Sequence, residues 1–155
     1  MTFKPAAKLH SLLKRGSVAA ATAMLLNSPA SMAADEAIDS NIIEFTTYVR
    51  GTQGVVRCGL FDENGWLKKT LQSATANIYQ GRAVCVFRKV RPGTFGISAF
   101  HDANNNGKID LNFLGMPVED YCASRNARGV FGPPSFEDAK FKYTGNRLRL
   151  AVSMK

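Results

Sequence analysis

Residues 43–50 read Ile-Glu-Phe-Thr-Thr-Tyr-Val-Arg, with an apolar or β-branched side chain at every second position. This alternation has the period of a β-strand, whose successive side chains point to opposite faces. We therefore expect Ile43, Phe45, Thr47 and Val49 to face a core. The same period returns along most of the chain, in three further runs: Val56, Cys58 and Leu60; Phe95, Ile97 and Ala99; and Leu148, Leu150 and Val152.

Turn residues separate these runs, and one of them, Gly145-Asn146, predicts a two-residue β-hairpin between residues 141–143 and 148–152. About seven strands are expected, near residues 42–50, 54–62, 75–80, 83–90, 94–101, 138–144 and 147–154. We predict an all-β fold, a single antiparallel β-sandwich of the Ig-like or prealbumin-like kind, without a long helix. Its core should include Phe45, Val56, Leu60, Val86, Phe95, Ile97, Leu148 and Leu150.

The N-terminus has the composition of a secretory signal peptide, predicted over residues 1–33. Four basic residues precede a short apolar run, Val18 to Leu26, and Ser31-Met32-Ala33 offers small residues for cleavage before Ala34. The apolar run is too short for a membrane span. We expect residues 34–41 to form a flexible leader, residues 42–155 to form the β-sandwich domain, and the protein to be periplasmic or secreted.

Removal of the signal peptide changes the charge balance. The whole chain carries +8, but without residues 1–33 it has 16 basic and 12 acidic residues, a net charge of +4. The remaining Lys and Arg are scattered in sequence and are not interleaved with aromatic residues. This pattern gives no support to nucleic-acid binding.

Three cysteines, Cys58, Cys85 and Cys122, enter an oxidising compartment if the chain is exported. Cys58 and Cys85 both lie in strand-like runs, which favours a bridge between them, although three pairings and buried free thiols stay open. A bridge closing about 28 residues stabilises by roughly 3–4 kcal/mol in the chain-entropy model. Cys122 is then a free thiol that could link two copies, so the protein is expected to be a monomer or a dimer through Cys122.

The stretch 101–110, His-Asp-Ala-Asn-Asn-Asn-Gly-Lys-Ile-Asp, predicts a cation loop. Oxygen-bearing side chains alternate with other residues and a glycine follows, which is the arrangement that surrounds Ca²⁺. The expected ligands are Asp102, Asn104, Asn106, the carbonyl of Lys108, and Asp110.

The loop departs from an EF-hand, because Phe113 stands where a bidentate glutamate is required. A distal carboxylate is needed, and Glu119 is favoured over Asp120. Affinity should be weak, on the order of 10⁻⁴–10⁻³ M, because the loop has few formal charges. The alternative is a metal-free turn rich in Asn and Asp, whose side chains bond to their own backbone.

The loop lies in a long irregular segment, residues 102–137, whose apolar content predicts an ordered excursion. His101, the only histidine after the signal peptide, precedes Asp102, but neighbours in a strand point to opposite faces. We therefore expect His101 to be structural and assign no catalytic residue. A hydrolase using His101 with Glu119 or Asp120 is the alternative function. Trp66 is expected to be a partly buried loop anchor.

Three stretches carry a family resemblance: residues 91–110, residues 112–119 (Asn-Phe-Leu-Gly-Met-Pro-Val-Glu) and residues 134–139 (Pro-Ser-Phe-Glu-Asp-Ala). They resemble a bacterial exported family, domain-of-unknown-function family 2141, over about residues 43–154. The resemblance implies a signal peptide and a β-sandwich, and no activity. Cys122 departs from the family pattern, which commonly has glycine there.

Together these features predict an exported, non-enzymatic β-sandwich module stabilised by one calcium ion. The expected partner is an exported protein or a glycan.

Overall fold

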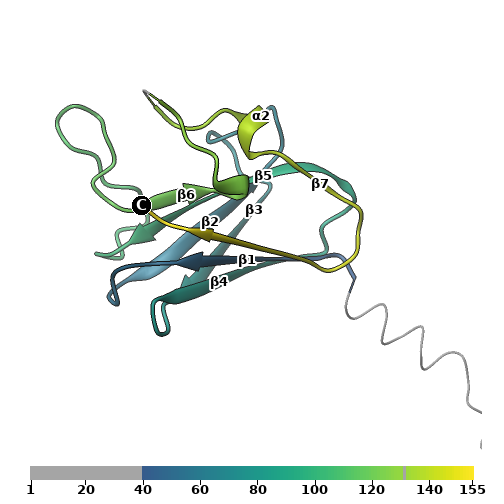
Figure 1. Ribbon diagram of the computed structural model, residues 1–155, viewed down its shortest axis with the longest axis horizontal. Helices are drawn as coiled ribbons and strands as arrows, with labels where there is room; N and C mark the ends of the chain where they lie inside the picture. Colours follow the sequence, from purple (N-terminus) through teal and green to yellow (C-terminus); the bar gives the residue numbers. More distant parts are fainter. Residues whose placement is uncertain (1–39, 131) are drawn as a thin grey trace, which may run out of the picture.

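The computed structural model describes residues 40–130 and 132–155, so the expected signal peptide and most of the leader lie outside the described residues. Two β-sheets pack face to face (Figure 1). The three-stranded sheet has the order β4-β1-β8, and the larger sheet has the order β3-β2-β5-β6, with β7 also paired to β5. The expectation of an all-β sandwich is confirmed. No described helix is long and apolar enough to cross a membrane.

The strands follow the expected runs, with three differences at the boundaries. Their bounds are β1 Ile42–Tyr48, β2 Val55–Phe61, β3 Gln72–Asn77, β4 Arg82–Arg88, β5 Gly93–Asp102, β6 Tyr121–Ala123, β7 Phe141–Tyr143 and β8 Leu148–Ser153. β3 begins earlier than expected, β6 lies inside the segment expected to be a long loop, and the start of the expected strand 138–144 is the short helix α2, Phe136–Ala139. A 3₁₀ turn, η1, spans Ser124–Asn126.

The predicted hairpin at Gly145-Asn146 is wrong. β7 pairs with residues 93–95 of β5, whereas β8 runs parallel to β1 in the other sheet, so the connection between them crosses from sheet to sheet. The ten-residue β5 exposes an edge long enough for both β6 and β7, which leaves β8 free to complete the smaller sheet. The turn is held to the start of β1 by a bond from the amide of Asn41 to the carbonyl oxygen of Gly145, 2.6 Å.

The core lies between the two sheets and is built from the inward positions of the alternating runs. Phe45, Val56, Leu60 and Ile97 are buried as expected, while Phe95, Leu148 and Leu150 pack against them partly buried. Val86 is the one wrong assignment. Ala83, Cys85 and Phe87 face inward on β4, and a period of two therefore places Val86 on the outer face.

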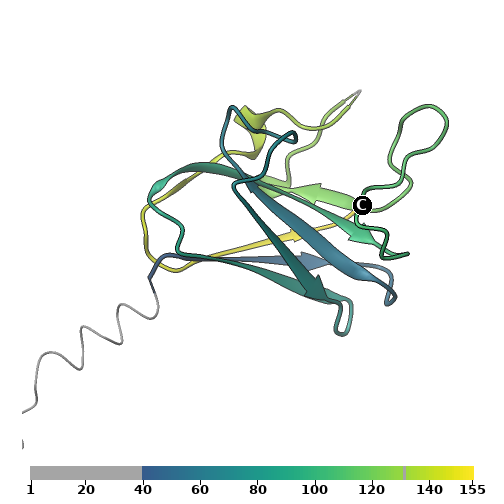
Figure 2. The same cartoon turned by 180° about the vertical axis from the view of Figure 1, so that it is seen from behind.

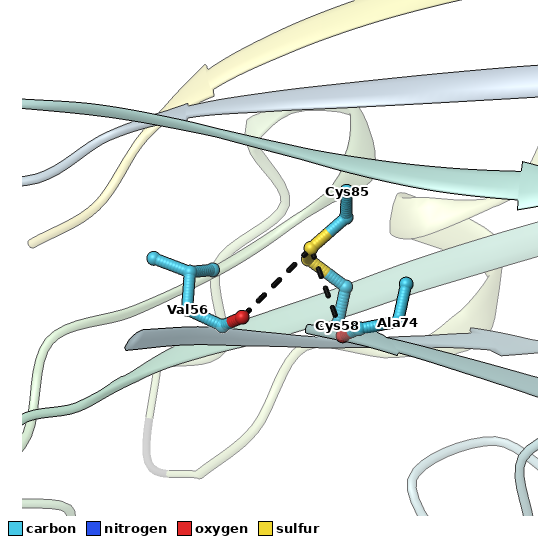
Figure 3. Close-up of a disulfide and its surroundings, with 4 residues drawn as sticks. All are labelled: Val56, Cys58, Ala74 and Cys85. Atoms are coloured by element: carbon cyan, nitrogen blue, oxygen red, sulfur yellow. Dashed lines mark hydrogen bonds between the residues drawn. A yellow bond between two sulfur atoms is a disulfide. The ribbon is translucent and has the colours of Figure 1, made fainter. Parts of the chain in front are cut away.

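The disulfide joins Cys58 of β2 to Cys85 of β4, as the strand context of the two residues indicated. It therefore links the two sheets through the centre of the core (Figure 3). The Cys85 sulfur lies 3.7 Å from the carbonyl oxygen of Ala74 and 4.0 Å from that of Val56. A disulfide sulfur carries no proton, so these are packing contacts.

A second, smaller cluster covers one end of the larger sheet. Trp66 packs edge-on against Phe61 and Phe136, with ring centroids 5.4 and 5.7 Å apart, and its indole nitrogen donates to the carbonyl of Pro134, 2.8 Å. Trp66 is thus the loop anchor that the sequence suggested, and it fixes the loop 62–71 to the segment around α2.

Thr47 offers a test of this core. Its side chain is fully buried on β1, and its hydroxyl oxygen has no hydrogen-bond partner. Because a buried unpaired hydroxyl is destabilising, we expect Thr47→Val, which keeps the shape, to raise the free energy of unfolding by about 1 kcal/mol. Urea denaturation of the purified protein measures the difference.

The matched control is Thr46→Val, on the outer face of the same strand, which should change stability little. A Thr47→Val protein less stable than the wild type would show that the hydroxyl has a partner.

Candidate functional site

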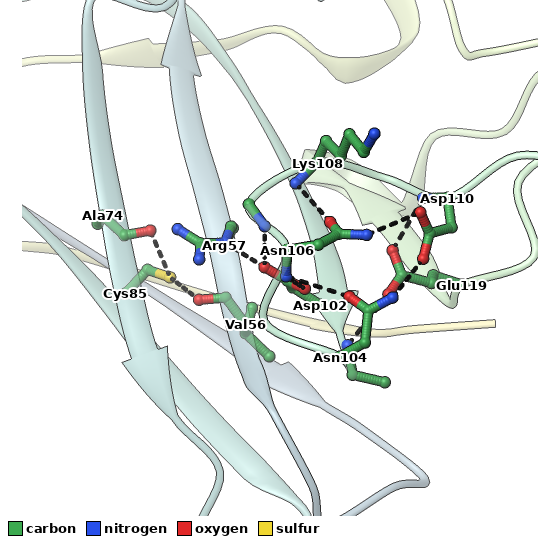
Figure 4. A network of polar contacts seen from close by, with 12 residues as sticks. Val56, Arg57, Ala74, Cys85, Asp102, Asn104, Asn106, Lys108, Asp110 and Glu119 are labelled. Atoms are coloured by element: carbon green, nitrogen blue, oxygen red, sulfur yellow. Dashed lines mark hydrogen bonds and ion pairs between the residues drawn. The ribbon is translucent and has the colours of Figure 1, made fainter.

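The polar loop expected to bind a cation begins at a buried carboxylate. Asp102 is the last residue of β5 and is fully buried. Its Oδ2 accepts a hydrogen bond from Nε of Arg57, which comes from the neighbouring strand β2, and the two form an ion pair (Figure 4). The Arg57 guanidinium thus supplies a positive charge beside the first expected ligand.

The first half of the loop is closed by side chains that bond to its own backbone. Asp102 accepts from the amides of Asn106 and Gly107, each at 2.9 Å. Asn104 accepts from the amide of Asn106 at 3.1 Å, and Asn106 accepts from that of Lys108 at 3.0 Å. Gly107 takes a positive φ of 85°, which is open to glycine without strain. These are the bonds of a turn rich in Asn and Asp.

The second half brings in the two remaining carboxylates. Asp110 accepts from the side-chain amides of Asn104, at 2.7 Å, and Asn106, at 2.8 Å. Glu119 spans the loop, accepting from the backbone amides of Ala103, at 3.0 Å, and Asp110, at 3.1 Å. The structure therefore unites the expected side-chain ligands in one hydrogen-bonded network, including the distal Glu119. Lys108 takes part through its amide.

Within the described residues, no three His, Cys, Asp or Glu side chains form a group that could hold a metal ion. A cation in this network would therefore have to draw on amide and carbonyl oxygens in addition to carboxylates. Each amide Oδ1 has two lone pairs, of which the backbone bond uses one.

The position of Asp102 also determines its protonation. Burial raises the pKa of its carboxyl, but the hydrogen bonds from Arg57, Gly107 and Asn106 outweigh burial. The pKa therefore lies below its ordinary value. Asp102 stays ionised and paired throughout the physiological range.

The residues of the hydrolase alternative have separate partners. His101 is buried, and its Nε2 lies 2.6 Å from the carbonyl oxygen of Gln53. Asp120 is paired with Arg50 at 2.7 Å, while Glu119 is taken up by two backbone amides. A catalytic base needs a substrate or nucleophile within hydrogen-bond reach. Nothing in this arrangement favours hydrolysis.

Cys122 is the free thiol that the sequence suggested, but it is fully buried in β6. Burial raises its pKa to about 12, against a weaker opposing effect of Arg128. A disulfide between copies requires an accessible thiolate, so a dimer through Cys122 would require β6 to open.

An apolar projection rises from the polar network, and the sequence did not indicate its exposure. Residues 111–118, here called the finger, form the loop that extends beyond the strands in Figure 1. Phe113 is 94% exposed, and Leu111, Leu114, Met116 and Val118 are exposed as well. The apolar content of residues 102–137 predicted an ordered segment, but it did not predict that these five side chains would face solvent.

The finger is nevertheless internally bonded. Asn112 accepts from the amides of Leu114 and Met116 through its side chain, at 2.9 and 3.0 Å, and from that of Gly115 through its carbonyl, at 2.9 Å. The amide of Asn112 donates to the carbonyl of Met116, and that of Val118 to Asp110. The finger thus combines exposed apolar side chains with a largely satisfied backbone.

Arg57 is the second residue that sequence reasoning missed. It stands at an outward position of β2, between Val56 and Cys58, where a basic residue looks like ordinary surface. Its partner is 45 residues away, and only the pairing of β2 with β5 brings the two together. No local pattern could have identified this contact.

A family model described as an uncharacterized protein conserved in bacteria (DUF2141) matches residues 46–150. No curated protein and no solved structure matches the chain.

The buried carboxylate predicts acid sensitivity. Because the folded pKa of Asp102 is depressed, its contribution to stability is present above the ordinary value of 3.8 and is lost as the pH falls below it. We expect Asp102→Asn to be less stable than wild type at pH 7, and to lose less further stability between pH 5 and 3. Thermal melts across this range test both points. The control Glu137→Gln, which changes an exposed carboxylate, should keep the wild-type dependence of stability on pH. If Asp102→Asn also kept the wild-type dependence, the ion pair of Asp102 with Arg57 would be contradicted.

The burial of Cys122 predicts a protected thiol. In the folded protein, iodoacetamide at pH 8 should modify Cys122 far more slowly than in denaturant, because the thiol is both inaccessible and protonated. Mass spectrometry follows the modification, and Cys122 is the only free cysteine. Equal rates in native and denaturing buffer would show that β6 opens readily.

Proposed function

Because the chain belongs to this uncharacterised bacterial family, whose description supplies no activity, we propose a function from the site itself. The protein is an exported, non-enzymatic binding module. Its polar loop, residues 102–110 with Glu119, takes up one weakly held Ca²⁺ and holds the finger in place. The finger is the contact surface for a partner with an apolar pocket.

The exposed finger is the observation that carries this proposal. Five large apolar side chains are exposed within eight residues that include no charged residue. Exposed apolar clusters of this kind usually mark an interaction surface. The backbone amides of the finger are largely bonded within it. The free energy of desolvating the finger on binding is therefore lower, because few backbone donors would lose a partner.

The polar network supports a structural rather than a catalytic role. Asp102, Asp110 and Glu119 all accept bonds from loop donors, so no carboxylate is left as a general base. The Cys58–Cys85 bridge supports export, because disulfides persist in oxidising compartments.

Calcium fits the donor types of the loop, which are the hard oxygens of Asp, Asn, Glu and backbone carbonyl. Asp102, Asn104, Asn106, the Lys108 carbonyl, Asp110 and Glu119 would hold it. Asp110 would have to exchange its bonds from the two asparagine side chains for the ion, and Arg57 would repel it. Both effects support an affinity at the weak end, on the order of 10⁻⁴–10⁻³ M.

Thermal melts in EGTA and in calcium test the proposal. An ion that binds only the folded state stabilises by about 2.7 kcal/mol at a hundredfold excess over its Kd. For a domain of this size we expect the melting temperature to rise by about 8–12 °C. Hydrogen exchange at the amides of Leu114 and Met116 should slow in the same conditions, because the finger rises from the loop.

Asp102→Ala and Asp110→Asn should abolish the calcium response, whereas Glu63→Gln, which removes one exposed carboxylate elsewhere, should keep it. A wild-type melting temperature indifferent to calcium would leave the metal-free turn as the correct description. A response that survives both loop variants would place the ion elsewhere.

A further inference from the structure

The outer face of the three-stranded sheet is open. Both short helical elements and the finger lie on the other side of the molecule or beyond the strand ends, and no described segment crosses this face (Figures 1 and 2). Its outward positions include Glu44, Thr46 and Tyr48 on β1, between Val84 and Val86 on β4 and Arg149 and Ala151 on β8.

Unpaired positive charge collects along one edge of this face. Arg82 and Arg88 begin and end β4, and Lys89 and Arg91 follow in the next turn, all four exposed. None of the four has an ion-pair partner among the described residues. Residues 82–92 contain no acidic residue. Basic side chains thus lie at both ends of β4, with the outward positions of Val84 and Val86 between them.

The positive charge on the opposite edge is partly compensated. Glu44, the only acidic residue in the three strands, accepts from Arg149 at 2.8 Å and from Arg147 at 2.7 Å. Most of the uncompensated charge therefore lies along β4, where four basic residues have no acidic partner in the described part of the chain.

Two exposed tyrosines lie at the Arg82 end of this edge. Tyr48, 50% exposed, is the register partner of Arg82 on β1. Tyr79, 75% exposed, exchanges both backbone hydrogen bonds with Arg82, at 2.8 and 3.0 Å. Backbone pairing thus places Arg82 between two tyrosines whose side chains are exposed.

We propose that this edge, the β4 stripe of Arg82, Arg88, Lys89, Arg91, Tyr48 and Tyr79, binds a linear acidic polysaccharide. Guanidinium groups bind carboxylates in a bidentate manner, and tyrosine rings offer an apolar face with a polar end to a sugar ring. Six residues of strand separate Arg82 from Arg88, about 20 Å, which matches an extended chain of several sugars.

The distribution of charge selects this ligand over other polyanions. A flat anionic membrane would be served by a face that is equally cationic on both edges, whereas Glu44 reduces the charge of Arg147 and Arg149 on the β8 edge from +2 to +1. The cross-sheet disulfide supports an oxidising compartment, apart from cytoplasmic nucleic acid, and this favours an acidic polysaccharide as the linear polyanion. The proposal goes beyond the proposed function, and it depends neither on calcium binding by the polar loop nor on the finger.

The β4 stripe is tested by titrating the protein with a fluorescent oligogalacturonate. The protein is used in the form that results from processing in the cell. The titration is done in EGTA, so that failure of the calcium loop and failure of the stripe are separable. We expect Arg82→Gln with Arg88→Gln to weaken binding about tenfold, and to reduce its salt dependence, because two exposed charge pairs are lost. The matched control, Lys68→Gln with Lys69→Gln, removes the same charge from another exposed segment and should change binding less than about twofold.

Tyr79→Ala, which alters no charge, should also weaken binding, and this readout does not depend on the stability of the double variant. Equal losses in the arginine and lysine pairs would overturn the proposal in favour of net charge alone. Equal affinity for single-stranded DNA or for anionic vesicles would overturn the choice of ligand, and absence of binding at low salt would overturn the site.

Discussion

The buried carboxylate of Asp102 is the interaction on which the polar loop and the finger depend. It terminates β5, pairs with Arg57 of the adjacent strand, and accepts the amides that close the following turn. A buried charge is tolerated only when it is paired and hydrogen-bonded, so this residue requires both the strand pairing and the loop conformation. The loop in turn positions Asp110 and Glu119, between which the finger begins and ends.

The sandwich beneath is held by a different kind of constraint. Its core is formed by the inward faces of alternating strands, and the Cys58–Cys85 bridge crosses it from sheet to sheet. The bridge ties the segments of β2 and β4 together in the unfolded chain, which lowers the conformational entropy of that state and so stabilises the fold. The free thiol is sequestered in β6, so the chemistry of cysteine in this fold is structural.

This division of labour leaves two surfaces of opposite character. At one end, the finger presents apolar side chains without charge, supported by a polar network whose donors and acceptors are matched. β4 contains no acidic residue and has an exposed arginine at each end, and two exposed tyrosines lie beside the first of them, Arg82. A single domain thus carries an apolar surface on the finger and a cationic surface on β4. The two can coexist because they are formed by different elements of the fold.

The sequence by itself determined most of the side chains that face inward, because period two is a local property: Phe45, Val56 and Ile97 are buried as their alternation indicates, whereas Val86 was assigned to the wrong face. It also favoured the disulfide pair over two other pairings, and it indicated the family and the residues that form the polar loop. Only the tertiary structure decided which strands pair. β8 joins β1 in parallel although its turn to β7 has hairpin composition, because pairing depends on which edges remain open. For the same reason the partner of Arg57, the exposure of Phe113 and the alignment of Arg82 with Tyr48 could not be predicted from local pattern. All three features depend on contacts, or on the lack of contacts, between residues distant in the chain. These contacts exist only once both sheets have formed.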